Sequence, residues 1–139
     1  MGAGAGSIFA RIVAGEIPCQ RVFENEHVLA FLDINPLAEG HTLVLPKRTV
    51  ARLADLTSEE AAELGRQVVA IASKVLSATG AEALNILLND GRVAGQEVPH
   101  VHFHIIPRRA DDGLGYRWRP KKRSAEELAA LAARIAALS

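Results

Sequence analysis

Three histidines at alternate positions are the residues that most directly indicate chemistry in this sequence: His100, His102 and His104. Side chains on a β-strand alternate between its two faces. An extended segment here would therefore place the three imidazoles on one face and the apolar residues between them on the other. An imidazole can attack phosphorus and form a covalent intermediate that water then breaks, while neighbouring imidazoles hold its tautomer or move protons. The spacing therefore indicates nucleophilic catalysis at a phosphate.

Two other interpretations of the histidine segment fit the same spacing. The three side chains could form an ordinary polar strand face in which each imidazole is hydrogen-bonded. That arrangement is disfavoured because clustered imidazoles titrate near neutral pH and repel one another when charged. Alternatively, histidines at alternate strand positions can share one metal ion. The motif alone leaves the metal site open.

The loop before the histidines bears on this choice, because a phosphate needs hydrogen-bond donors close to its oxygens. Gly91 and Gly95 allow close approach of the backbone, and Asn89 and Gln96 add side-chain amides. Each preorganised donor can stabilise charge on phosphorus by about 2–4 kcal/mol. Alone, the loop is better explained as an ordinary glycine-rich connection. Joined to the histidines, it favours phosphate chemistry without a G-x-x-x-x-G-K phosphate loop, which the sequence lacks.

The elements that must position these residues predict an α+β domain with an antiparallel sheet of about five strands. Thr57 begins a capping box that predicts one long helix, which Gly80 is expected to end. Apolar residues from Leu64 to Val75 give that helix one apolar face. Ser7 and Ser124 are placed to cap a short N-terminal helix and a C-terminal helix. The expected strands are residues 21–24, 28–33, 42–46, 83–88 and 100–106, the last stopped by Pro107.

Composition excludes several other classes of protein. The chain has 139 residues, 16 basic and 16 acidic, and this zero net charge disfavours binding to a nucleic acid polymer. Cys19 is the only cysteine, so no intrachain disulfide can form. No apolar run approaches the roughly 18 residues of a membrane span, and no signal peptide is evident, so we expect no membrane association and a cytoplasmic location. Residues 1–6 alternate Gly and Ala after Met1 and are expected to be disordered.

Residues 100–106 match the H-φ-H-φ-H-φ-φ signature of the histidine triad (HIT) superfamily, where φ is apolar. The resemblance covers residues 7–109, which are expected to form a HIT domain with a HIT-like fold. Residues 110–139 would be a C-terminal extension ending in a helix. The other segments that carry the resemblance are residues 8–9, 12–18, 30–34, 40–47, 89–91 and 95–98.

The resemblance implies a role for each matching residue. His102 would be the nucleophile, His100 and His104 would orient imidazoles and contact phosphate, and His41 would pair with the triad. Asp33 would bind the ribose hydroxyls, a role that suits two carboxylate oxygens. The remaining implied residues are the phosphate-binding Asn89, Gly95, Gln96 and Glu97, and the base pocket formed by Phe9, Ile12, Ile17, Phe31 and Ile34.

Two departures from relatives shape the expectations. Some bacterial relatives bind structural zinc through a Cys-x-x-Cys pair, where this chain has Ser7 and Ala10. We therefore expect no bound metal and no cofactor. Relatives active on phosphoramidates often carry Ser or Thr where this chain has Glu97. Glu97 could act as an acid or weaken phosphoramidase activity, so it bears on the leaving group and not on the nucleophile.

The resemblance implies a homodimeric enzyme that acts at the α-phosphate of a purine nucleotide through a nucleotidyl-histidine intermediate. A nucleoside phosphoramidate, in which AMP is joined to an amine, is the favoured substrate. A diadenosine polyphosphate is the first alternative, and a nucleotide-binding module without catalysis is the second. The basic stretch from Arg117 to Arg123 could guide the extra phosphates of a dinucleotide or be a solvated tail.

Overall fold

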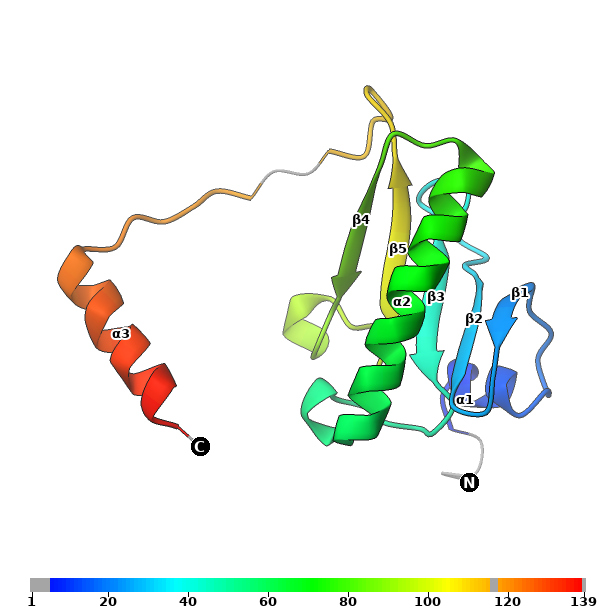
Figure 1. Ribbon diagram of the computed structural model, residues 1–139, viewed down its shortest axis with the longest axis horizontal. Coiled ribbons are helices and arrows are strands. Elements are labelled where there is room, and N and C mark those ends of the chain that lie inside the picture. Colours follow the sequence, from blue (N-terminus) through cyan, green and yellow to red (C-terminus); the bar gives the residue numbers. More distant parts are fainter. Residues whose placement is uncertain (1–5, 116–117, 139) are drawn as a thin grey trace.

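The computed structural model describes residues 6–115 and 118–138. Residues 1–5 of the predicted disordered segment lie outside this part of the chain. Five antiparallel strands form one sheet in the order β1-β2-β3-β5-β4 (Figure 1). The predicted α+β class and antiparallel sheet are confirmed. The strands are β1 (Arg21–Glu24), β2 (Val28–Leu32), β3 (Thr42–Pro46), β4 (Ala83–Leu88) and β5 (Phe103–Arg108).

The long helix α2 (Ser58–Thr79) has the beginning and the end that its sequence predicts. The Thr57 side chain accepts a hydrogen bond from the backbone N–H of Glu60, and the Glu60 carboxylate accepts one from the backbone N–H of Thr57. This capping box satisfies two backbone donors that the first turn would otherwise leave unpaired. Gly80 ends the helix in the left-handed conformation, with φ of 67°, which glycine adopts without steric cost.

The two faces of the sheet are covered by different helices because successive strand residues point in opposite directions. Helix α2 lies across one face (Figure 1). The short helix α1 (Ile8–Val13), capped by Ser7, packs on the other face. The core under α2 contains Val28, Ala30, Val44, Leu64, Val68, Ile71, Ala72, Val75 and Ile105, and the core under α1 contains Phe9, Ile12, Leu29, Phe31, Leu43 and Leu45.

The predicted bounds of the last strand are wrong at both ends. Strand β5 begins at Phe103, because the backbone N–H of Val101 donates to the Val50 carbonyl, 2.7 Å away, in the segment after β3. Pro107 does not stop the strand, which runs to Arg108. The Arg108 carbonyl faces β4, so Pro107 directs its nitrogen to the opposite side, beyond the end of β3, where no N–H is needed. Of the three histidines in the segment, His104 therefore lies within the strand, and His100 and His102 precede it.

The register of the sheet fixes which residues His104 lies beside. Phe31 pairs with Leu43 across β2 and β3, and Leu43 pairs with His104 across β3 and β5. Directly paired residues of antiparallel strands share a face. His104 therefore continues an apolar row on the face that α1 covers. Phe31, Leu43 and His104 all line one pocket on this face.

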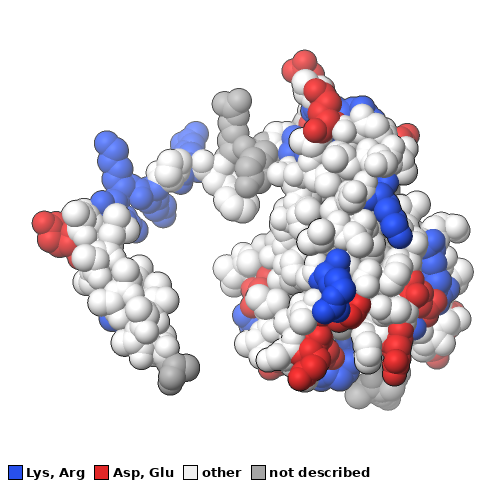
Figure 2. Space-filling view, viewed as in Figure 1, with Lys and Arg blue, Asp and Glu red and all other residues white. Residues whose placement is uncertain are grey.

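The C-terminal helix α3 (Ala125–Ala137) is present as predicted, and Ser124 caps it through a second capping box with Glu127. None of its residues is buried, and it stands apart from the sheet on the β4 side (Figure 1). Basic side chains gather along the segment that leads to it (Figure 2). Within the described ranges, no helix is both long and apolar enough to cross a bilayer.

Candidate active site

The ring of His102 is held in one tautomer by the backbone. Its Nδ1 lies 2.7 Å from the carbonyl oxygen of His100, which can only accept, so Nδ1 carries the proton. The lone pair is therefore on Nε2. The ring of Phe9 meets the imidazole edge to face, with centroids 4.8 Å apart and an angle of 89°. These two contacts fix the orientation of the ring and leave Nε2 unprotonated.

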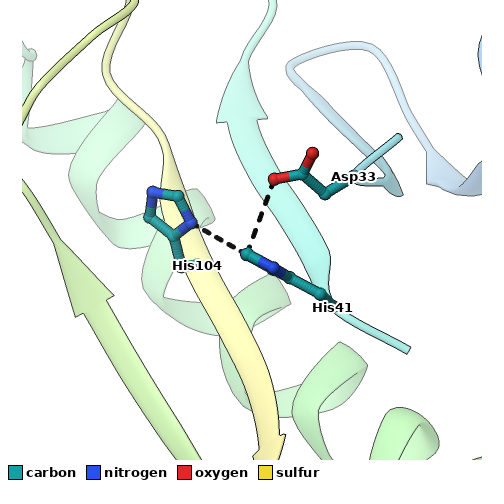
Figure 3. Close-up of side chains that lie close together, drawn as sticks. All are labelled: Asp33, His41 and His104. Atoms are coloured by element: carbon teal, nitrogen blue, oxygen red, sulfur yellow. Dashed lines mark hydrogen bonds and ion pairs between the residues drawn. The ribbon is translucent and has the colours of Figure 1, made fainter. Parts of the chain in front are cut away.

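A second hydrogen-bonded chain fixes the tautomers of His41 and His104 (Figure 3). The backbone N–H of Leu37 donates to Nδ1 of His41 over 3.1 Å, so the His41 proton is on Nε2. That Nε2–H donates to Nδ1 of His104, 2.9 Å away. The proton of His104 is consequently on its own Nε2. Asp33 Oδ2 lies 3.7 Å from His41 Nε2 and adds a negative charge to this end of the chain.

His100 lies behind the site and is fully buried. Its Nε2–H donates to the Pro46 carbonyl oxygen over 2.7 Å, and its Nδ1 is buried without a hydrogen-bond partner in the described part of the chain. His100 is absent from the lining of the pocket. Its contact with the pocket residues is the hydrogen bond that its carbonyl oxygen accepts from His102, and its expected contact with phosphate stays a prediction.

Burial keeps the four clustered histidines neutral at pH 7. It is the largest cause of the lowered pKa of His41, His100, His102 and His104. The pKa of His104 falls to about 4, because the neighbouring His102 and His41 add to the effect of burial. The charge of Asp33 partly opposes the shift of the His102 and His104 pKa. A neutral imidazole retains the lone pair that a nucleophile needs.

A pocket of about 440 Å³ opens in front of His102. Phe9 and Phe31 line it and contact each other edge to face, with centroids 5.7 Å apart. All five predicted base-pocket residues line it, although Ile34 is 79% exposed. The other predicted residues that line it are Asp33, His41, Asn89, Gly95, Glu97, His102 and His104.

Gln96 is the predicted phosphate-loop residue that does not line this pocket. Its Oε1 accepts from the backbone N–H of Gly91 over 2.7 Å, and its Nε2 donates to the Ala51 carbonyl over 2.8 Å. Both ends of the amide are thus occupied in holding the loop. Asn89 instead lies in the pocket beside Gly95, where an added Cβ would meet its amide at 3.5 Å.

Several pocket residues were missed by sequence reasoning. Leu43 could have been found, because the alternation of the strand over residues 42–46 and its pairing with Phe31 place it on the site's face. Loop residues offer no comparable periodic signal, since their positions depend on tertiary contacts. The missed residues are Ile8, Pro18, Cys19, Asn35, Leu37, Leu43 and Val98.

Asp33, His41 and His104 also bring metal-ligating atom types together, all within 4.8 Å of one another. This spacing is compatible with one small ion, but the hydrogen bonds from Leu37 to His41 and from His41 to His104 account for it without one.

At the N-terminus, where some relatives have a zinc-binding cysteine pair, the Ser7 hydroxyl accepts a hydrogen bond from the N–H of Ala10 and caps α1. The absence of structural zinc stays a prediction.

The fold and the site together define an α+β protein in which buried, neutral histidines meet an apolar pocket. The chain belongs to the HIT domain family, which matches residues 14–111. Its fold is similar to a HIT family protein of Bacillus subtilis, whose crystal structure gives a TM-score of 0.91 at 41% identity, covering 96% of this chain and 97% of that one.

Two relatives carry names that denote an activity. The chain is 44% identical to an adenosine 5′-monophosphoramidase of Schizosaccharomyces pombe, over 92% of this chain and 94% of the relative. It is 38% identical to an adenylylsulfatase of Arabidopsis thaliana, over 77% of this chain and 54% of the relative. The family membership and these relatives support a nucleotide hydrolase. The two names denote different leaving groups, so the relatives do not fix which bond this chain breaks.

Proposed function

We propose that this protein hydrolyses purine nucleoside 5′-phosphoramidates through a nucleotidyl-His102 intermediate. The observation that carries the proposal is the bond from His102 Nδ1–H to the His100 carbonyl, which leaves a neutral Nε2 lone pair beside the pocket. When Nε2 forms a bond, the ring gains positive charge. The carbonyl at 2.7 Å then stabilises that charge through a charge-assisted hydrogen bond.

The reaction proceeds in two steps. In the first, Nε2 of His102 attacks the α-phosphorus and forms an N–P bond. The bond from phosphorus to the leaving nitrogen breaks, and that nitrogen keeps the electron pair and takes a proton from water. In the second step, a water oxygen attacks phosphorus and loses its proton to solvent. The N–P bond breaks, the electron pair returns to Nε2, and the nucleoside monophosphate leaves.

The pocket divides into an apolar end and a polar end that match the two parts of a nucleotide. Phe9, Phe31 and Ile12 form the apolar end, which suits a purine ring. Asp33 lies at its edge, where Oδ1 caps the turn by accepting from the Asn35 N–H over 2.9 Å. Oδ2 is not part of that turn, and we assign it to the ribose hydroxyls.

The chain from His41 to His104 supplies a donor to the phosphate. Because Nδ1 of His104 accepts from His41, Nε2 of His104 bears a hydrogen. We assign that N–H, with the Asn89 amide, to the non-bridging phosphate oxygens. Such donors stabilise the charge that grows on those oxygens during attack. A module that only binds nucleotides has no need of the fixed Nε2 lone pair on His102.

The protein is proposed to act as a homodimer joined beside β4 and α2. Among the residues that the structure describes, strand β4 forms an edge of the sheet and pairs with β5 alone. Ile86 on β4 is 45% exposed and faces the α2 side, since it pairs with Ile105 of the core under α2. Val69 on α2 is 72% exposed. Covering these side chains with a second copy would remove apolar surface from water.

Light scattering tests the dimer. The wild type should have twice the mass of the chain, and a Val69→Asp/Ile86→Asp variant should have the mass of one chain. Val22→Asp, on the opposite edge strand β1 and 39% exposed in the wild type, is the matched control and should stay dimeric. A monomeric wild type, or a Val69→Asp/Ile86→Asp variant that stays dimeric, would contradict this arrangement.

Turnover of two substrates tests the proposed activity. Adenosine 5′-phosphoramidate and diadenosine tetraphosphate are incubated with wild type and with His102→Ala, and AMP release is followed by chromatography. We expect faster release from the phosphoramidate by the wild type and none above background by His102→Ala. Preference for the tetraphosphate would assign the protein to dinucleotide hydrolysis. No release from either substrate by the folded wild type would leave a binding module.

A further inference from the structure

A second hollow lies beside the nucleotide pocket, on the outer side of the glycine loop. Its volume is about 690 Å³. It shares Gly95 and Glu97 with the nucleotide pocket, so the two hollows meet at these residues. We call it the arginine groove after its two guanidinium groups. Its lining is Ala51, Arg52, Gly91, Arg92, Gly95, Gln96, Glu97 and Pro99.

The two arginines of this groove differ in how they are held. Arg52 Nε donates to Asp90 Oδ1 over 3.1 Å, and the same oxygen accepts from the Leu53 N–H over 2.8 Å. Arg52 therefore braces the loop, and its charge is partly balanced. Arg92, in the short 3-10 helix η3 (Arg92–Ala94), is exposed and forms no ion pair with any residue in the described ranges. Its charge is available to a ligand.

The guanidinium group of Arg92 gives the arginine groove a donor for an anion. Two guanidinium groups and the single carboxylate of Glu97 line the arginine groove. Since Asp90 already holds Arg52, Arg92 is the cation left to meet a negative group. Guanidinium groups bind carboxylate and phosphate oxygens through paired N–H donors.

The residues that the two hollows share suggest a place for the arginine groove in the reaction. The nucleotide pocket contains the apolar residues Phe9 and Phe31 together with His102, and it meets the groove at Glu97 and Gly95. A nucleotide with its base in the apolar end and its α-phosphate at His102 would direct the group beyond that phosphate across this boundary. We propose that the arginine groove receives the leaving group, and that Arg92 selects leaving groups carrying a carboxylate or phosphate. This inference rests on the proposed function.

Two matched substrates test the selection in turnover. They are the adenosine 5′-phosphoramidates of alanine and alaninamide, which differ in having a carboxylate or a carboxamide on the leaving amine. Arg92→Ala should lower kcat/KM for the alanine compound about fivefold relative to the alaninamide compound, as expected for an exposed charge pair. Arg92→Lys should retain most of the preference. Arg66→Ala, an exposed arginine on α2 across the sheet, is the control and should leave the ratio unchanged.

A binding measurement keeps the test independent of turnover. By calorimetry, wild type should bind ADP more tightly than AMP, because the β-phosphate reaches Arg92. The ratio of the AMP to the ADP dissociation constant should be about fivefold smaller in Arg92→Ala. Higher salt should reduce the preference of the wild type. Equal effects of Arg92→Ala on both members of each pair would overturn the inference. If calorimetry shows the preference while neither phosphoramidate is hydrolysed, the proposed function fails and the anion site stands.

Discussion

The histidine segment and the glycine loop both border the pocket, but they are held in opposite ways. Residues 100–104 are mostly buried, and backbone carbonyls hold His100 and His102. The loop over residues 89–97 is mostly exposed, and the amide of Gln96 braces it from within. Burial and fixed hydrogen-bond partners together determine which nitrogen of each imidazole carries a proton, and a reactive imidazole depends on that protonation. Exposure leaves charges such as Arg92 free to meet a substrate. We therefore expect changes in the histidine segment to alter chemistry and changes at the loop to alter selectivity.

The largest expected effect in this comparison is that of His102→Ala. It should lower kcat roughly 10⁴-fold or more, since removing a nucleophile abolishes the covalent path. AMP should still bind, because the apolar end of the pocket is unchanged. The matched control is His27→Ala, whose side chain is 63% exposed and lies outside the cluster. Stopped-assay kinetics and calorimetry measure the two effects, and full turnover by His102→Ala would remove the proposed mechanism.

Acid should destabilise the histidine segment before it affects the surface ion pairs. The buried histidines have a lowered pKa in the folded state, so the unfolded chain binds more protons below its own histidine pKa of 6.5. The stability that the neutral histidines contribute is fully present above pH 6.5. It is lost as the pH falls towards about 4, the pKa of His104 in the folded protein. By pH 5 the free energy of unfolding should fall on the order of 2 kcal/mol. Urea unfolding between pH 7 and pH 5 measures this, and a flat profile would contradict neutral, buried imidazoles.

Gln96→Ala tests the internal brace of the loop and should have a smaller effect. It leaves the Gly91 N–H and the Ala51 carbonyl without their partner, which costs about 1–3 kcal/mol. We expect kcat/KM to fall about tenfold with the pH profile unchanged, because the histidines are untouched. Gln67→Ala, which removes a comparable bond to Glu63 on α2, should leave kcat/KM unchanged. A shifted pH profile in Gln96→Ala would show that the two segments are coupled.

Asp33→Ala acts at the boundary between binding and chemistry, and its effect is measured as a ratio between two classes of nucleotide. It should weaken the binding of ribonucleotides about tenfold more than that of 2′-deoxynucleotides, since only ribonucleotides lose a charge-assisted hydrogen bond to a 2′-hydroxyl. Any effect through His41, whose Nε2 lies 3.7 Å from Asp33 Oδ2, acts on both substrates and cancels in the ratio. Equal weakening of both, measured by calorimetry, would remove the ribose assignment.

Local sequence signals predicted the framework of the fold well. The Thr57 capping box, the terminal Gly80 and the spacing from Leu64 to Val75 depend on neighbours within one helix, and the structure has each as expected. The predicted start of β5 was wrong, because the true start depends on a long-range hydrogen bond from Val101 to Val50. Nothing within residues 100–106 reveals that bond.

The sequence indicated most of the residues that line the pocket, but it did not indicate which hydrogen bonds they form. The residues implied by the family motif lie together around the pocket, apart from the buried His100 and the loop-bracing Gln96. Both exceptions arise from contacts with carbonyl oxygens elsewhere in the chain, of Pro46 at the end of β3 and of Ala51 in the segment after it. Residue types alone do not indicate which polar atoms a fold will occupy. The residue roles, the homodimer and the cytoplasmic location stay predictions.

The most direct test of the account is to trap the covalent intermediate. Wild type is mixed with adenosine 5′-phosphoramidate, quenched within milliseconds and examined by intact-protein and peptide mass spectrometry. The account predicts one adenylyl group per chain, bonded to His102, that is absent from His102→Ala and present in His27→Ala. Rapid AMP release without any adduct on His102, or an adduct on another residue, would contradict it.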